Sequence, residues 1–126
     1  YLAGSDTLRA KDLMDMFLDD EVDGILCYKG GYGAQRMLPY IDFEVLKGHP
    51  KLLVGFSDVT VLLNTLYQFS NMPTVHGEMG VCMQNYEEFT FNHFFEMLEN
   101  GFINVFLNHT KRLKIYLINN IVMMKS

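Results

Sequence analysis

Residues 51–60 read Lys-Leu-Leu-Val-Gly-Phe-Ser-Asp-Val-Thr, and this stretch predicts a strand, a tight turn and a helix in immediate succession. The apolar run 52–54 stops at Gly55, and a second apolar run with helical spacing covers residues 59–69. Ser57 falls at the tip of the turn, where its side chain would project from the sheet edge at the positive N-terminus of the helix. This arrangement is typical of a nucleophile elbow, in which the next backbone N–H faces a developing oxyanion.

Two features favour Ser57 as a nucleophile, and one leaves a simpler interpretation open. Gly55 has no Cβ, so a tight turn is sterically allowed. Asp58 lies in the first turn of the helix, where its backbone N–H has no helical partner. The pattern Gly-Phe-Ser-Asp-Val nevertheless departs from G-x-S-x-G, and Ser57 could instead be an ordinary N-cap.

The rest of the chain predicts an α/β fold, with a parallel sheet flanked by helices. Short apolar strands alternate with segments of helical periodicity, as expected for a sheet covered on both faces. Strands are predicted at residues 25–28, 52–54 and 74–76, and helices at 6–18, 34–40, 42–46, 59–69 and 87–98. The glycine-rich loop 29–33 and the turn 55–58 both follow strands, so both belong at the carboxyl edge of the sheet.

The glycine-rich loop could supply a second oxyanion donor. Its sequence, Gly30-Gly31-Tyr32-Gly33, lacks the spacing of nucleotide-binding loops, and a tight turn after a strand is the alternative. A nucleophilic serine also needs a base. The histidines are His49, His76, His93 and His109. His76 lies at the end of the predicted strand 74–76 and is the best local candidate, but the sequence alone does not locate the base.

Composition indicates one folded domain and excludes some partners. The chain has 126 residues and a formal net charge of −5, so it suggests neither a nucleic-acid nor a membrane partner. Cys27 and Cys82 are far apart and lack any metal spacing, which favours two reduced thiols. We find no signal peptide and no apolar run long enough to cross a bilayer, so a cytoplasmic location is expected.

The last 27 residues differ from the rest. Residues 1–99 carry nine net negative charges, whereas residues 100–126 carry four positive charges, no acid and five asparagines. We interpret residues 100–126 as an atypical tail, in which an apolar run at 115–118 is the only clear pattern, and which could be a truncated or frame-shifted end. A basic amphipathic helix for a membrane surface or a partner is the alternative.

Taken together, the residues resemble a family. The matching segments are Tyr1 to Asp6, Arg9 to Met14, Val22 to Ile25, Gly30 to Pro39, Asp42, Pro50-Lys51, Gly55 to Thr60 and Thr74 to Gly77. In this order they resemble the LD-carboxypeptidases (muramoyltetrapeptide carboxypeptidases), serine peptidases related to the microcin-immunity peptidases. The resemblance covers about residues 1–98, and its most specific part is Gly-Gly-Tyr-Gly followed downstream by Gly-Phe-Ser-Asp.

The resemblance implies an N-terminal α/β domain of a two-domain serine carboxypeptidase. Ser57 would be the nucleophile, and the backbone N–H groups of Asp58 and Gly31 would form the oxyanion hole. A Glu and a His of the triad would come from a C-terminal domain, and no metal or other cofactor would be needed. The substrate would be the tetrapeptide of cytoplasmic muropeptides, whose terminal D-alanine is removed during peptidoglycan recycling.

The chain also departs from the family pattern. It starts after the family's first strand and helix, and it ends near where the second domain would begin. No position replaces the missing Glu and His, and the motif that contains His76 is not that of the catalytic histidine. We therefore expect a fragment, incomplete at its N-terminus and inactive alone, whose exposed edges could favour a homodimer. The alternatives are a microcin-immunity-type peptidase and a non-catalytic α/β binding module.

Overall fold

The computed structural model describes residues 2–96, 98, 114–118 and 121–125. Its helices are α1 (Asp6–Leu18), α2 (Phe43–Leu46), α3 (Thr60–Ser70) and α4 (Glu88–Glu96), with the 3₁₀ helices η1 (Gln35–Tyr40), η2 (Ser57–Val59) and η3 (Cys82–Asn85). Its strands are β1 (Gly24–Cys27), β2 (Leu52–Gly55), β3 (Thr74–His76), β4 (Lys114–Ile118) and β5 (Ile121–Lys125). The predicted order of strands and helices up to α4 is confirmed.

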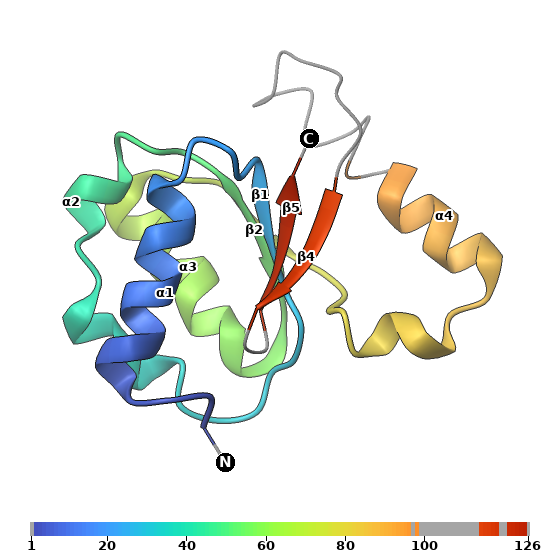
Figure 1. Cartoon of the computed structure of the whole chain (residues 1–126), viewed down its shortest axis with the longest axis horizontal. Helices are drawn as coiled ribbons and strands as arrows, with labels where there is room; N and C mark the ends of the chain where they lie inside the picture. The colour runs from blue at the N-terminus through green and yellow to red at the C-terminus, as the bar shows by residue number, and fades with distance from the viewer. Residues whose placement is uncertain (1, 97, 99–113, 119–120, 126) are drawn as a thin grey trace.

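The strands form one sheet in the order β3-β2-β1-β5-β4. β1 pairs with β2, and β2 with β3, in parallel, so the predicted α/β class with a parallel sheet is confirmed. β5 pairs with β1 and β4 with β5 in antiparallel fashion, which makes the complete sheet mixed. Figure 1 shows this hairpin beside β1.

The hairpin was not predicted as two strands. The sequence indicated only the apolar run 115–118, whereas the structure has five-residue strands on both sides of residues 119–120. All four residues of β1 are buried, and the backbone groups on its free side need partners, which β5 supplies. The alternative of an amphipathic helix is wrong for residues 114–118 and 121–125, while residues 99–113 lie outside the described part of the chain.

Helix α1 begins where the sequence predicted. Ser5 is its N-cap, and the Ser5 hydroxyl accepts a hydrogen bond from the Leu8 N–H over 3.1 Å. The helix buries Ala10, Leu13, Met16 and Phe17 on one side. This helical spacing of apolar residues packs α1 onto the sheet beside η1 and α2.

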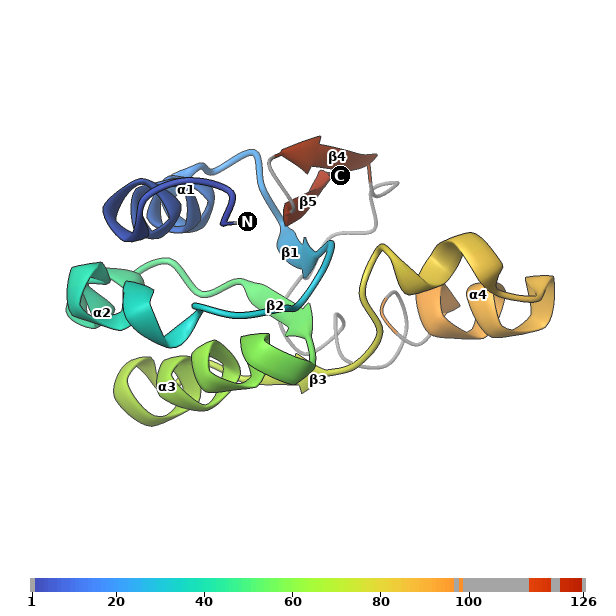
Figure 2. The ribbon, with the colours of Figure 1, turned by 90° about the horizontal axis from the view of Figure 1, so that it is seen from below.

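Helices cover both faces of the sheet. Figure 2 shows α1, α2 and α3 on one face and α4 on the other. The larger core lies under the first three helices and includes Leu13, Phe17, Ile25, Leu53 and Leu66. The smaller core lies toward α4 and contains Leu26, Leu52, Val54, Val75 and Leu98, with Phe94 and Phe95 packed against it. The side chains of successive strand residues therefore pack into opposite cores.

The helix predicted over residues 34–40 is the 3₁₀ helix η1, which contains Pro39 and ends at Tyr40; this short 3₁₀ form accommodates the missing N–H of the proline. On α4, Phe91 is 40% exposed, and its ring packs against that of Phe95 with 4.7 Å between centroids.

Both cysteines are free, as predicted. Cys27 is buried at the end of β1, and burial raises the pKa of its thiol to about 12. At neutral pH this thiol is therefore protonated and a poor nucleophile.

Candidate functional site

Ser57 stands on a strained turn between β2 and α3. Its φ is +60°, a left-handed value that costs an L-residue about 1–2 kcal/mol. Within the described residues, Asn71 is the only other non-glycine residue with a positive φ, and it ends α3. The Ser57 side chain is exposed. The predicted strand, tight turn and helix are confirmed, with the serine at the tip.

Ser57 does not act as a helix cap. The N-cap position of η2 is Phe56, that of α3 is Val59, and neither helix start has a side-chain capping hydrogen bond. Since a capping serine would accept a hydrogen bond from a backbone N–H two or three residues on, the cap interpretation loses its support. The hydroxyl remains available for other chemistry.

Gly55 is required by packing. A Cβ at this position would lie 2.9 Å from Cγ1 of Val59 and 3.2 Å from Cβ of Cys27. Real Cβ atoms essentially never approach a neighbour closer than 3.0 Å, and Val59 is β-branched and stiff. The glycine therefore lets the first turn after β2 close against the end of β1.

The glycine-rich loop lies directly against Ser57. A Cβ built on Gly30 would be 3.2 Å from Cβ and 3.4 Å from Oγ of Ser57. Gly31 and Gly33 have φ values of +134° and +107°, which side-chain-bearing residues rarely adopt. The structure thus brings together the serine turn and the loop that the sequence placed at the same sheet edge.

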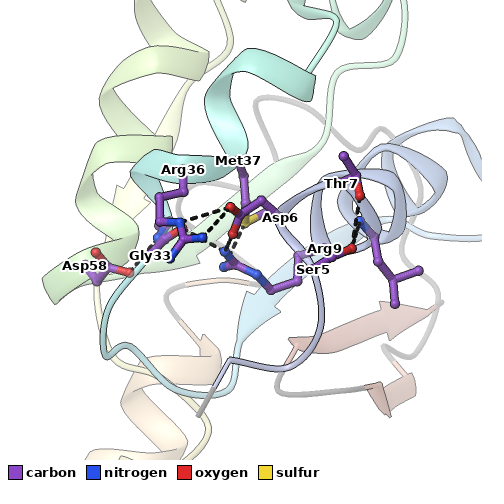
Figure 3. Close-up of polar contacts among 10 residues, drawn as sticks. Ser5, Asp6, Thr7, Arg9, Gly33, Arg36, Met37 and Asp58 are labelled. Carbon is purple, nitrogen blue, oxygen red and sulfur yellow. Dashed lines mark hydrogen bonds and ion pairs between the residues drawn. The ribbon is translucent and has the colours of Figure 1, made fainter.

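A polar network fixes the end of this loop (Figure 3). The Ala34 N–H donates to Oδ2 of Asp58 over 2.8 Å, and Nη2 of Arg9 donates to the Gly33 carbonyl over 2.9 Å. Asp6 forms ion pairs with Arg9 at 2.6 Å and with Arg36 at 2.8 Å. The hydrogen bond from Arg9, together with Arg36, holds the pKa of the Asp6 carboxyl below its usual value despite some desolvation.

Sequence reasoning missed this network. Arg9 and Arg36 entered only as residues that carry the family resemblance. Arg9 and Asp6 are three residues apart on α1, a spacing at which opposite charges meet on a helix. That spacing could have indicated the local pair, but nothing in the sequence indicates a bond to a carbonyl 24 residues away.

The segment after β3 also contributes to this edge. The Gly77 N–H donates to the Gly55 carbonyl over 3.0 Å, and the Gly80 N–H to the Cys27 carbonyl over 3.1 Å. The chain therefore crosses the carboxyl ends of β2 and β1. Buried Met79 lies beside the loop, since its Cε would be 3.3 Å from a Cβ on Gly30.

None of the histidines in the described part of the chain reaches Ser57. His76 pairs in register with Gly55, but its ring is exposed and meets the Phe56 ring edge-on, with 6.3 Å between centroids. The His93 ring contacts the Phe89 carbonyl on α4, and His49 lies in the turn before β2. His109 lies outside the described residues. The local base that the sequence left open has therefore not been located.

The described residues contain no group of three or more His, Cys, Asp or Glu side chains arranged to hold a metal ion. Among the helices of this part of the chain, none combines the length and apolar character needed to cross a membrane.

The fold and the turn define an α/β domain whose polar groups gather at the carboxyl edge of its parallel strands, where such sheets carry their sites. Residues 1–77 match the family described as LD-carboxypeptidase N-terminal domain, and the chain belongs to this family. The resemblance stated from the sequence is thereby confirmed.

Three similar proteins illustrate the relationship. The "Probable murein peptide carboxypeptidase" of Bacillus subtilis (strain 168) is 46% identical over 79 residues, which are 63% of this chain and 25% of the relative. The muramoyltetrapeptide carboxypeptidase of Oxalobacter formigenes has a solved structure with a TM-score of 0.67 at 27% identity, covering 89% of this chain and 36% of that one. The solved structure of an MccF-like protein of Bacillus anthracis str. Ames gives a TM-score of 0.68 at 32% identity, and the match covers 75% of this chain and 30% of that one.

The chain is much shorter than its relatives, since it spans about a quarter of the length of the curated relatives it matches. Peptidase chemistry is thus a property of the family to which this domain belongs.

Proposed function

We propose that this chain supplies the nucleophile domain of a serine-type LD-carboxypeptidase, which removes the terminal D-alanine from muropeptide tetrapeptides in cytoplasmic peptidoglycan recycling. The single observation that carries the proposal is the exposed Ser57 at φ +60° on a strand-to-helix turn. The named relatives that act on murein peptides support the substrate class.

In the proposed mechanism, Ser57 Oγ attacks the carbonyl carbon of the bond that precedes the terminal D-alanine. The carbonyl oxygen gains negative charge, and the N–H groups of Asp58 and Gly31 would donate hydrogen bonds to it. The intermediate collapses to an acyl-enzyme when the D-alanine amine leaves with a proton, and water then hydrolyses the ester.

The proton transfers need a base, which the described residues do not place next to Ser57. We propose that a His, oriented by a Glu, comes from a second domain, as the family resemblance implies. Residues 1–99 would then form the body of the nucleophile domain, and the β4 and β5 strands at 114–118 and 121–125 extend its sheet beside β1. This mechanism uses no metal ion or organic cofactor.

The test is D-alanine release from an LD-linked muropeptide tetrapeptide by the complete gene product. We expect Ser57→Ala to lower kcat by about 10⁴- to 10⁶-fold with an intact fold, because the nucleophile is lost. Asn64→Ala, an exposed change on α3, is the matched control and should keep full activity. Activity retained by Ser57→Ala would refute the nucleophile assignment.

A second candidate is a microcin-immunity-type peptidase. The likeness to the MccF-like protein of Bacillus anthracis favours it, since MccF is the microcin C7 self-immunity protein. Cleavage of an aminoacyl sulfamoyl nucleoside in preference to the tetrapeptide would establish this alternative. A fluorophosphonate probe separates both enzymes from a non-catalytic binding module, in which Ser57 of the complete gene product would stay unlabelled.

A further inference from the structure

One peptide group of the glycine-rich loop is held at both of its polar atoms. The carbonyl of Gly33 accepts from Nη2 of Arg9 at 2.9 Å, and the N–H of Ala34, in the same peptide group, donates to Oδ2 of Asp58 at 2.8 Å. Figure 3 shows both bonds. The two partners come from different elements, Arg9 from α1 and Asp58 from η2. A rotation of this peptide group would break both hydrogen bonds together.

The loop needs such a constraint. Gly31 and Gly33 are both at positive φ, and glycine moves between positive and negative φ at little cost. A Cβ placed on Gly31 would meet nothing within 4 Å, so no neighbouring atom packs against this side of the residue. A hydrogen-bond donor stabilises a developing oxyanion only when it is oriented beforehand.

Arg9 is itself held in place. Its side chain is 13% exposed and pairs with Asp6 at 2.6 Å, while Nη1 contacts Sδ of Met37 at 3.3 Å. Asp6 also pairs with Arg36 on η1, the helix that follows the loop. Asp6 and Met37 therefore help to orient the guanidinium that donates to the Gly33 carbonyl.

Asp58 links the two halves of the site. Its backbone N–H lies in the serine turn, and its carboxylate holds the loop that contains Gly31. One residue thus couples the position of Ser57 to that of the glycine-rich loop.

We propose that the side chains of Arg9 and Asp58 are positioning residues, which clamp the Gly33–Ala34 peptide and thereby fix the Gly31 N–H relative to Ser57. The inference rests on the proposed function, because it assigns these residues a role in the same attack by Ser57.

The test compares four variants of the complete gene product. Arg9→Met keeps the length of the side chain and removes its donors, whereas Arg9→Lys keeps one ammonium donor. Asp58→Ala removes the acceptor, whereas Asp58→Asn keeps an acceptor oxygen at the same length. Lys11→Met is the matched control, since it breaks an exposed ion pair with Asp15 elsewhere on α1.

We expect Arg9→Met and Asp58→Ala to lower kcat by about 10- to 100-fold with little change in KM, because the donor is misplaced in the transition state. Arg9→Lys and Asp58→Asn should recover most of the loss, and Lys11→Met should match the parent protein. The rate of Ser57 labelling by a fluorophosphonate should fall in parallel, since its phosphoryl oxygen uses the same donors.

Either of two results would overturn the clamp: kcat and labelling rate unchanged in Arg9→Met and Asp58→Ala, or Asp58→Asn as impaired as Asp58→Ala while thermal unfolding is unaltered. If Asp58→Ala does not fold, the comparison of Arg9→Met with Arg9→Lys tests the clamp. If the parent protein releases no D-alanine but is labelled, the substrate proposal fails and the labelling rates still test the clamp. A parent protein that shows neither activity overturns both.

Discussion

At the scale of single residues, the glycines around Ser57 serve different purposes. Gly55 makes room for Val59, Gly30 makes room for the Ser57 side chain, and Gly31 and Gly33 provide positive φ. Ser57 has a positive φ although it is not glycine, so its backbone conformation costs some of the free energy of folding. Such backbone strain persists only where the surrounding contacts hold the residue in that conformation.

The packing role of Gly55 gives a prediction about stability. We expect Gly55→Ala to lower the free energy of unfolding by about 1–3 kcal/mol, because the added methyl group overpacks the contact with Val59 and Cys27. Gly48→Ala is the matched control, since its nearest neighbour would be at an ordinary 3.6 Å. Urea unfolding of both variants measures the difference, and equal stabilities would contradict the packing argument.

At the scale of secondary structure, α1 links the fold to the site. Its apolar side builds the larger core, while its first turn carries Asp6 and Arg9 toward the glycine-rich loop. Asp6 is also favourably placed at the positive N-terminus of this helix. The same helix therefore stabilises the sheet and orients the loop.

This first turn predicts a pH dependence of stability. The folded state lowers the Asp6 pKa below 3.8, so Asp6 stabilises the fold above that pH and loses this contribution as the pH falls through the folded pKa. The difference in unfolding free energy between the parent protein and Asp6→Asn should thus be present at pH 7 and shrink in acid. Glu44→Gln breaks an exposed ion pair with Lys47, and its unfolding free energy at pH 7 should differ less from that of the parent protein. A difference for Asp6→Asn that does not change with pH would contradict this linkage.

At the scale of the whole molecule, the site lies at the open edge of a two-sided domain. Both cores are closed by helices, but Ser57 and Gly31 at the carboxyl ends of the strands are exposed. The described residues provide the hydroxyl and the proposed donors, and they place no histidine against Ser57. The proposed attack by Ser57 would therefore need a base that approaches this edge.

We therefore predict that the 126-residue chain, expressed alone, releases D-alanine no faster than its own Ser57→Ala variant. The physical reason is that an unactivated serine hydroxyl is a weak nucleophile. Circular dichroism should accompany the assay to verify the fold. Turnover that disappears in both Ser57→Ala and His76→Ala would refute the prediction and identify His76 as a local base.

The sequence determined the features that depend on neighbours along the chain. The Ser5 cap, the Asp42 cap of α2, the three parallel strands and the turn at Ser57 all follow from local patterns, because capping, periodicity and glycine placement act within a few residues. The sequence also predicted that the glycine-rich loop and the Ser57 turn lie at the same edge of the sheet, since parallel strands have their carboxyl ends at one edge.

Only the tertiary structure decided the contacts that span distant segments. The bonds of Gly33 and Ala34 to Arg9 and Asp58 each join residues 24 positions apart, and the antiparallel pairing of β5 joins the tail to β1. No spacing rule selects such partners, because many charged groups could reach a given carbonyl and many strands could fill a sheet edge. The choice among them is made by the packing of the whole domain.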